Sequence, residues 1–143
     1  MIAPVLIAKE NVPAVLPLVE KELAQVVETF ALDNCAYSDV VASLYDCTRQ
    51  LWVTTDDLGQ LRGWTVTRIT ATNGSRRLMF DFLGGKDIDK MLECLPYIEA
   101  WARQYDATET IAYARPGLRR KLKTKGFRHV CDLVVKPLQG QVH

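Results

Sequence analysis

The fold of this chain is decided by residues 61–87, which read LRGWTVTRITATNGSRRLMFDFLGGKD. Residues 61–70 are rich in Trp, Thr, Val and Ile, which favour β-strands. Asn73 and Gly74 both tolerate a positive φ and predict the turn of a hairpin. The returning strand is predicted over residues 77–83, and Gly84-Gly85 is expected to break it. The stretch therefore predicts an antiparallel hairpin that leads into a double-glycine turn.

Side chains alternate between the two faces of a strand. The returning strand is therefore predicted to place Leu78, Phe80 and Phe82 on one face and Met79, Asp81 and Leu83 on the other.

The chain before this hairpin predicts a strand, two helices and a further strand. Residues 2–8 read as the first strand, and Asn11 is a candidate N-cap for a helix that ends near Phe30. Pro17 predicts a bent or delayed start of that helix. Ser38 is the expected cap of the second helix, and the next strand covers residues 51–54.

The chain after the hairpin predicts a helix, a strand, a short basic helix and a closing strand. Asp87 is the expected cap of the first helix, and Pro96 should kink it. The last three elements are predicted over residues 110–114, 118–125 and 127–136, and Gly126 should stop the second helix. The resulting order, β-α-α-β-β-β-α-β-α-β, predicts an α/β (α+β) single domain over residues 1–143, with a mixed sheet and helices on both faces.

Composition excludes several classes of protein. The chain is 48% hydrophobic and 24% charged, as is ordinary for a globular domain. No apolar run approaches the ~18 residues that a membrane span needs, so we expect a cytoplasmic protein. Its cysteines lie far apart, without a histidine pair nearby, so we expect free thiols and no metal site. These are Cys35, Cys47, Cys94 and Cys131.

Positive charge is concentrated near the C-terminus. Residues 110–131 contain seven cations and no acid, whereas the rest of the chain contains 11 cations and 17 acids. This imbalance predicts an anionic partner surface. The basic segment comprises Arg115, Arg119, Arg120, Lys121, Lys123, Lys125 and Arg128.

The element order, Gly84-Gly85 after the hairpin and Lys125-Gly126-Phe127 near the end together resemble the GNAT acetyltransferases. Several phrases are similar, more narrowly, to the short GNAT-like proteins of tailed phages, among them an internal virion or virion-assembly protein of short-tailed phages. That resemblance implies protein partners among virion components, and a location in the host cytoplasm or the virion. The phrases are residues 49–53, 82–85, 98–103, 115–117 and 125–127.

The resemblance also implies where acetyl-CoA would bind. In GNAT enzymes the loop that follows the fourth strand holds the pyrophosphate on backbone N–H groups at a helix N-terminus. The matching residues here are Leu83, Gly84, Gly85, Lys86 and Asp87. Lys86 could meet a phosphate, but the family's G-x-G spacing is missing. Asp87 and Asp89 would compete with the phosphate for the N–H groups and repel its charge.

The family's acid and base positions are also altered. Many GNAT enzymes protonate the leaving thiolate with a tyrosine five residues before the Phe of the "G-F" pair, and that position is Leu122. Asp81 is the candidate general base if its face lines the cleft, and a surface carboxylate if that face meets solvent.

Three hypotheses follow from the sequence. The first is a phage-type GNAT-fold protein that lacks acetyltransferase turnover and acts through protein contacts in virion assembly. The second is an acetyl-CoA-dependent N-acyltransferase with a divergent loop. The third is a small nucleic-acid-associated module that uses the basic segment, without the interleaved aromatic residues of a stacking platform.

Overall fold

The computed structural model describes residues 3–30 and 35–138. The chain divides into two compact units, Met1–Tyr113 and Ala114–His143, which are described separately. The single domain expected over residues 1–143 stays a prediction.

A mixed β-sheet organises the first unit. Its strand order in the described residues is β1-β2-β3-β4-β5, antiparallel throughout except for β5, which runs parallel to β4. The hairpin of β3 and β4 is its longest pairing, and its turn has a positive φ at both Asn73 and Gly74, as predicted. The strands are β1 (Val5–Leu6), β2 (Gln50–Thr55), β3 (Leu61–Thr72), β4 (Ser75–Gly85) and β5 (Ala107–Ala112).

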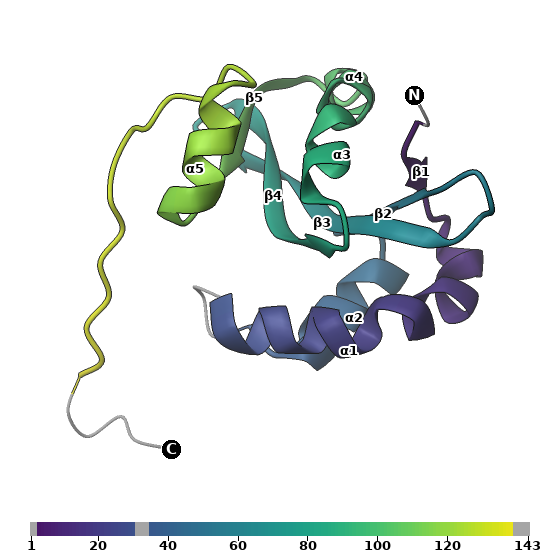
Figure 1. Ribbon diagram of the computed structural model, residues 1–143. Helices are drawn as coiled ribbons and strands as arrows, with labels where there is room; N and C mark the ends of the chain where they lie inside the picture. Colours follow the sequence, from purple (N-terminus) through teal and green to yellow (C-terminus); the bar gives the residue numbers. More distant parts are fainter. Residues whose placement is uncertain (1–2, 31–34, 139–143) are drawn as a thin grey trace. The chain divides into compact units, whose positions relative to one another are not determined.

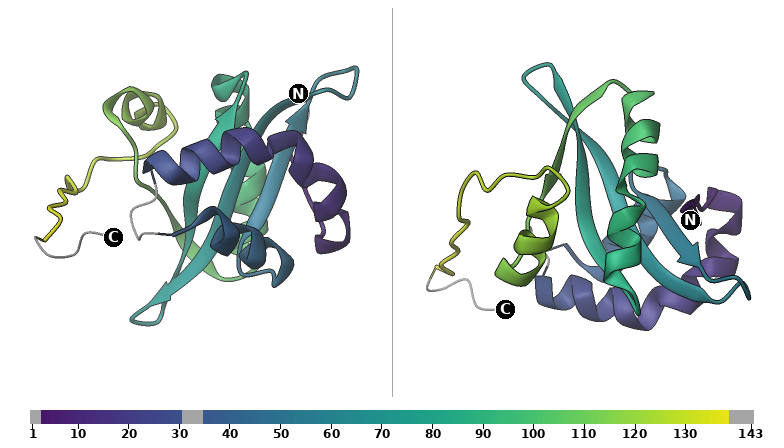
Figure 2. Two further views of the ribbon diagram at one scale, coloured as in Figure 1. Left: turned by 90° about the horizontal axis from the view of Figure 1, so that it is seen from below. Right: turned by 45° about the horizontal axis from the view of Figure 1, so that its top comes forward.

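Helices cover both faces of this sheet, as the sequence predicts. Figure 1 shows α1 and α2 below the sheet and α3 and α4 above it, and Figure 2 (left) shows α1 and α2 across one face. The fold class is therefore confirmed as α+β, with a mixed sheet covered by helices on both faces. The helices of this unit are η1 (Lys9–Asn11), α1 (Val12–Phe30), α2 (Tyr37–Tyr45), α3 (Ile88–Glu93) and α4 (Leu95–Arg103).

Two separate hydrophobic clusters hold the helices to the sheet. On one face, α1 and α2 bury residues such as Leu23 and Val40 against Trp64, Val66 and Phe82. On the other face, Met91 of α3 and Ile98 of α4 pack with strand residues. The strand members of that second cluster are Trp52, Leu78 and, partly buried, Ile69, Phe80, Leu83 and Ala107.

A β-bulge in β4 overturns the predicted alternation of its side chains. Val66 pairs with Phe82 and the next residue of β3, Thr67, pairs with Phe80, so Asp81 is the extra residue. A bulge of this kind shifts the alternation by one residue. Phe82 therefore packs toward α1 and α2, while Phe80 and Leu83 share the opposite face, contrary to the prediction.

The first helix starts directly after Asn11, as predicted, without the delay expected from Pro17, and the second helix starts earlier than predicted. Asn11 ends the 3-10 turn η1, and α1 begins at Val12 and continues through Pro17, so its start is not delayed. The second helix begins at Tyr37 rather than after Ser38. Its N-terminus is fixed by Asp39, whose Oδ2 accepts a hydrogen bond from the Ala36 N–H at 2.9 Å.

The predicted break in the next helix is confirmed. Cys94 separates α3 from α4, and Pro96 lies in the first turn of α4, where its missing N–H costs no helical hydrogen bond. Burial raises the pKa of the Cys94 thiol above its usual value. None of the four cysteines, all within the described residues, forms a disulfide. No helix within the described residues combines the length and apolarity needed to cross a membrane.

The second unit contains α5 (Pro116–Lys123), and Gly126 follows it with a positive φ of 94°. The Phe127 N–H returns to the Leu122 carbonyl at 3.2 Å, so the glycine stops the helix as predicted. The strand predicted over residues 127–136 is wrong. A strand needs a hydrogen-bonded neighbour, and none is recorded for these described residues, whose Val130 and Val134 are 74% and 88% exposed.

The double glycine of β4 is required by packing against β3. A Cβ on Gly84 would lie 2.4 Å from Cζ2 of the fully buried Trp64, whose indole N–H donates to Glu22. Gly85 has a φ of +119°, and a Cβ there would lie 2.5 Å from the Gly63 Cα. The strand therefore continues through both residues and ends at Gly85 rather than before them.

We expect Gly84→Ala to lower the free energy of unfolding by about 1–3 kcal/mol, because Trp64 has no room to move. The measurement is urea denaturation of both proteins. Gly117→Ala is the matched control, since its Cβ would enter open space. It should leave stability unchanged or raise it by at most about 1 kcal/mol. A Gly84→Ala protein as stable as the parent would contradict this account of the glycine.

Candidate functional site

The candidate site is built around Asp81, whose carboxylate lies between two arginines. Arg49 Nε lies 3.0 Å from Asp81 Oδ2, and Arg68 Nε lies 3.0 Å from Oδ1 and 2.9 Å from Oδ2. The side chains of Asp81, Arg49 and Arg68 are 9%, 12% and 34% exposed. Asp81 is therefore neither an open general base nor an ordinary surface carboxylate.

Three strands bring these side chains together. Arg68 follows Trp64 and Val66 at alternate positions of β3, so it lies on the face covered by α1 and α2. Asp81 follows Phe80, which packs with α3 and α4, so alternation places Asp81 on the face of α1 and α2, and the bulge brings Phe82 to that same face. Arg49 directly precedes β2 and is anchored to α2, where its Nη1 donates to Ser43 Oγ at 3.2 Å and its N–H to the Ser43 carbonyl at 3.1 Å.

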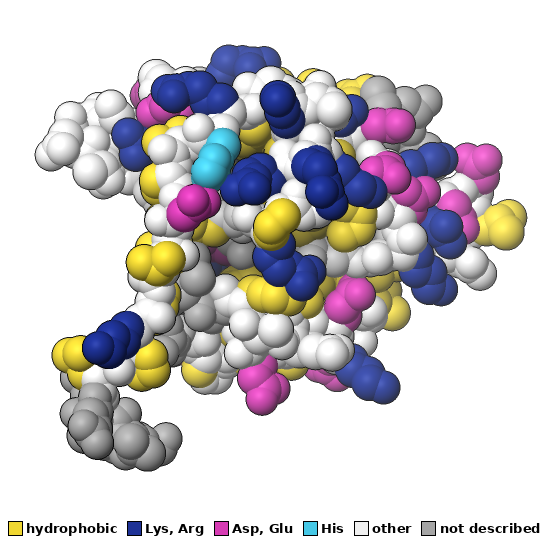
Figure 3. All heavy atoms as spheres, turned by 60° about the vertical axis from the view of Figure 1, so that its left-hand side comes forward, with side chains coloured by type: hydrophobic (Ala, Val, Ile, Leu, Met, Phe, Trp, Pro, Cys, Tyr) yellow, Lys and Arg dark blue, Asp and Glu magenta, His cyan; other side chains and the backbone are white. Residues whose placement is uncertain are grey.

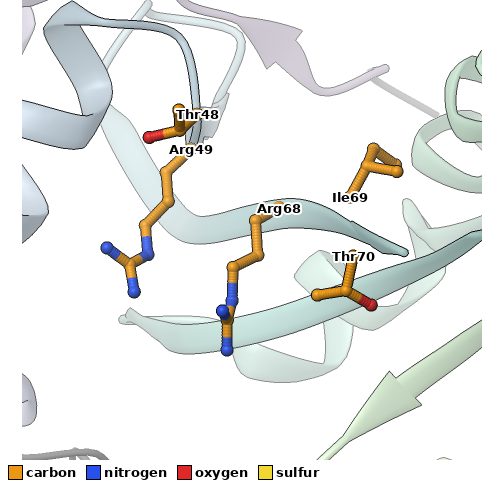
Figure 4. A pocket seen from close by; sticks show the side chains of 5 residues that line it. All are labelled: Thr48, Arg49, Arg68, Ile69 and Thr70. Carbon is orange, nitrogen blue, oxygen red and sulfur yellow. The ribbon is translucent and has the colours of Figure 1, made fainter. Parts of the chain in front are cut away.

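A pocket of about 380 Å³ opens beside this cluster. We call it the arginine pocket; its lining residues are Thr48, Arg49, Arg68, Ile69 and Thr70. Figure 4 shows the Arg49 and Arg68 side chains extending in the same direction, with their guanidinium groups on one side of β3.

A second carboxylate, Asp46, lies near Arg49 but accepts its hydrogen bonds from Thr48. Asp46 Oδ1 accepts from Thr48 Oγ1 at 2.6 Å and from the Thr48 N–H at 2.9 Å. These two hydrogen bonds, and then the charge of Arg49, lower the pKa of Asp46 below its usual value. Asp46 is therefore ionised at neutral pH, and it is exposed.

This arrangement disfavours the base chemistry predicted for Asp81. A general base must reach the proton of an amine, but both Asp81 oxygens already accept from guanidinium groups. An ammonium group entering the arginine pocket would also meet two positive side chains. The two guanidinium groups therefore disfavour the approach of a cationic acceptor to Asp81.

The residues predicted to hold acetyl-CoA, Leu83 to Asp87, lie at the end of β4 and the start of α3. The N–H groups of Lys86 and Asp87 both donate to the Arg62 carbonyl, at 2.9 and 3.2 Å. Asp87 caps α3 as predicted, since its Oδ1 accepts from the Lys90 N–H at 3.1 Å. Three donors that a pyrophosphate would use are thus engaged within the chain. Acetyl-CoA binding by these residues stays a prediction.

The predicted site residues are only partly brought together. Asp81 lies on the face of α1 and α2, whereas Leu83 packs on the opposite face with α3 and α4. Arg49 and Arg68 were missed by sequence reasoning. Arg68 could have been found from the sequence. It alternates with Trp64 and Val66 on one face of the predicted strand, and a cation on a face that packs into the core requires an acidic partner.

The second unit carries the other two predicted features, Leu122 and the basic segment. Leu122 is a buried residue of α5, so the family's tyrosine position has no proton donor here. Six of the seven cations are exposed, and Figure 3 shows Lys and Arg side chains on the surface in dark blue. Arg119 is the half-buried exception; its Nη1 lies 3.6 Å from Asp132, which also contacts His129 at 2.8 Å. In the described residues no group of His, Cys, Asp and Glu side chains could hold a metal.

Comparison with solved structures identifies the fold. A predicted acetyltransferase with acetyl-CoA from Clostridium acetobutylicum is 10% identical, with a TM-score of 0.69 and 100% of both chains covered. A ribosomal-protein-alanine N-acetyltransferase from Brucella melitensis biovar Abortus 2308 is 14% identical, with a TM-score of 0.66 over 94% of this chain and 99% of that one.

A third structure, an aminoglycoside acetyltransferase from an uncultured soil metagenomic sample in complex with sisomicin, has a TM-score of 0.68 at 8% identity, over 96% of this chain and 97% of that one. No protein-family model and no curated protein sequence matches this chain. The comparisons therefore identify the fold of this chain, which is that of the GNAT acetyltransferases. At sequence identities of 8–14%, the comparison supports the assignment of the fold but not of an activity.

We expect Asp81→Asn to lower the free energy of unfolding by about 3 kcal/mol, because it leaves two close guanidinium groups without their shared carboxylate. Urea denaturation measures the loss. Glu109→Gln is the matched control: Glu109 pairs with Arg77 at 3.0 Å, but it is 57% exposed. That substitution should cost less than about 1 kcal/mol. Equal losses in the two variants would show that the Asp81 cluster contributes no more than a surface ion pair.

Proposed function

We propose that this chain uses the GNAT fold without acetyltransferase turnover and acts through contacts with a partner protein. The observation that carries the proposal is the Asp81 cluster: the one predicted base accepts hydrogen bonds from Arg49 and Arg68. An amine acceptor has to be deprotonated before it attacks a thioester, and this carboxylate is committed to two cations.

Two further observations support the absence of turnover. The Arg62 carbonyl and the Asp87 carboxylate engage N–H groups that would otherwise face a pyrophosphate. Leu122 occupies the position from which the family's tyrosine would protonate the thiolate. Loss of the cofactor contacts and of both proton-transfer groups removes the main sources of rate enhancement, apart from positioning.

The finer role that we propose is assembly of a phage particle, with virion components as partners. Its support is the resemblance of several phrases, such as residues 82–85 and 125–127, to short GNAT-like proteins of tailed phages. A protein with this role would be found in the cytoplasm of the host cell or in the virion.

The first proposal is tested by adding acetyl-CoA. Isothermal calorimetry should give no saturable heat, and the melting temperature should stay constant up to about 1 mM ligand, because a ligand stabilises only a fold that binds it. The competing function is an acetyl-CoA-dependent N-acyltransferase, favoured by the fold and by Lys86 beside the double glycine. Saturable binding followed by release of the coenzyme A thiol with an amine acceptor would establish that function and overturn ours.

The exposed basic segment favours an anionic partner as a second candidate function. If this partner is a nucleic acid, binding should weaken by about 10³-fold or more between 50 and 200 mM salt, because six or more cations would each displace a counterion. Fluorescence anisotropy with a labelled DNA or RNA duplex measures this. Absence of binding at 50 mM salt would eliminate the nucleic-acid candidate.

A further inference from the structure

We propose that the turn between β3 and β4 is a site of spontaneous covalent modification, at which Asn73 loses its side-chain amide. The reaction is intramolecular: the backbone nitrogen of Gly74 attacks the side-chain carbonyl of Asn73. The inference goes beyond the proposed function, because it requires neither acetyl-CoA nor a partner protein.

The proposed reaction converts the asparagine into aspartate or isoaspartate. The Gly74 N–H gives up its proton to hydroxide or water, and the nitrogen forms a bond to Cγ of Asn73. The bond from Cγ to Nδ2 breaks, and Nδ2 takes up a proton and leaves as ammonia, so that a five-membered succinimide remains. Water then adds to one of the two carbonyl groups of this ring. Opening at one carbonyl gives aspartate, and opening at the other gives isoaspartate, whose main chain runs through the former side chain.

Nothing in the turn obstructs the attacking nitrogen. Gly74 has no side chain, and a Cβ placed there would have no atom within 4 Å beyond its own chain neighbours. A two-residue turn is closed by the residues that flank it, here Thr72 and Ser75, which pair across the strands. Within residues 35–138 no hydrogen bond is recorded for the Gly74 N–H or for the Asn73 side chain. Both reacting groups are therefore free of competing contacts there.

The turn has to open before the nitrogen can attack. Asn73 has a φ of 51°, and in this left-handed conformation the Gly74 nitrogen points away from the Asn73 side chain. Residues 71–74 are all exposed, and Figure 2 shows the turn at an end of the sheet beyond the helices that cover it. Exposed ends of elements open at a small fraction of the free energy of global unfolding. We therefore expect the reaction to proceed from the locally opened turn.

The isoaspartate product is incompatible with the hairpin as it stands. Its main chain contains one additional atom between Thr72 and Ser75, whereas a two-residue turn with a positive φ at both positions fixes their pairing. The aspartate product keeps the original main chain. The modification therefore produces two forms of the protein, one of which has a weakened end of the hairpin.

Asn11 provides an internal control in the same chain. It is also exposed, but the residue after it is Val12, whose N–H donates to the Lys9 carbonyl. The Val12 side chain is branched and buried. Attack by the Val12 nitrogen therefore meets a steric obstacle and requires a hydrogen bond to be broken first.

The experiment incubates the full chain at neutral pH and follows the peptides that contain Asn73 and Asn11 by digestion and mass spectrometry. Deamidation replaces an NH₂ group by OH, and fragmentation distinguishes isoaspartate from aspartate. We expect Asn73 to react about tenfold or more faster than Asn11. The reaction should be faster in mildly alkaline than in mildly acidic buffer, because the Gly74 nitrogen attacks without its proton.

Two comparisons identify the site and the opening step. Asn73→Gly retains a residue that tolerates a positive φ, so the hairpin should fold, and the mass increase of this peptide should disappear. A synthetic peptide of residues 69–78 gives the rate of the open turn. The full chain should react more slowly than this peptide, by up to about a hundredfold, because the turn is open for only part of the time.

Three results would overturn the inference. They are equally fast modification of Asn11 and Asn73, an unchanged mass increase in Asn73→Gly, and a reaction in the full chain more than about a hundredfold slower than in the peptide. The last would show that the folded turn protects Asn73. None of these results bears on acetyl-CoA binding or turnover, so this inference and the proposed function can fail independently.

Discussion

The pairing of β3 with β4, with its bulge at Asp81, is the constraint on which the site depends. A regular β4 would keep Phe80 and Phe82 on one face and would separate the two hydrophobic clusters differently. One extra residue sends Phe82 into the cluster under α1 and α2 and Leu83 into the cluster under α3 and α4. The bulge therefore places Phe82 on the same face as Asp81, whose carboxylate pairs with Arg49 and Arg68. Core packing and the surroundings of the site thus follow from the pairing of β3 with β4.

The close approach of β3 and β4 has a second consequence at the end of the hairpin. Because Gly84 lacks a Cβ, Trp64 can pack against it, and because Gly85 lacks one, the backbone of Gly63 can lie close to it. The same approach brings the Arg62 carbonyl within reach of the Lys86 and Asp87 N–H groups. A double glycine that resembles a phosphate-binding loop in the sequence therefore serves the packing of the sheet. This is a physical reason why a fold can be kept while the chemistry at its loop changes.

Much of the fold was accessible from local sequence signals. Asn73-Gly74, Asp87, Pro96 and Gly126 each act through their own backbone or a neighbour a few residues away, and each was located correctly. The predictions were wrong where the local structure depends on residues far away in the sequence. Val130 and Val134 have the composition of a strand, but a strand exists only with a pairing partner. Arg68 lies 13 residues from Asp81 in the sequence and Arg49 lies 32 residues from it. The pairing of both arginines with Asp81 therefore could not be predicted from sequence spacing.

The sequence by itself determined the order of most elements, the positions of the turns and caps, and the basic character of residues 115–128, because these depend on residue type and short-range hydrogen bonding. Only the tertiary structure decided that Asp81 is the shared ion-pair partner of Arg49 and Arg68, and that Gly84 is a packing residue. Both outcomes depend on the register between β3 and β4. A shift of one residue in that register moves every later side chain to the other face of the sheet.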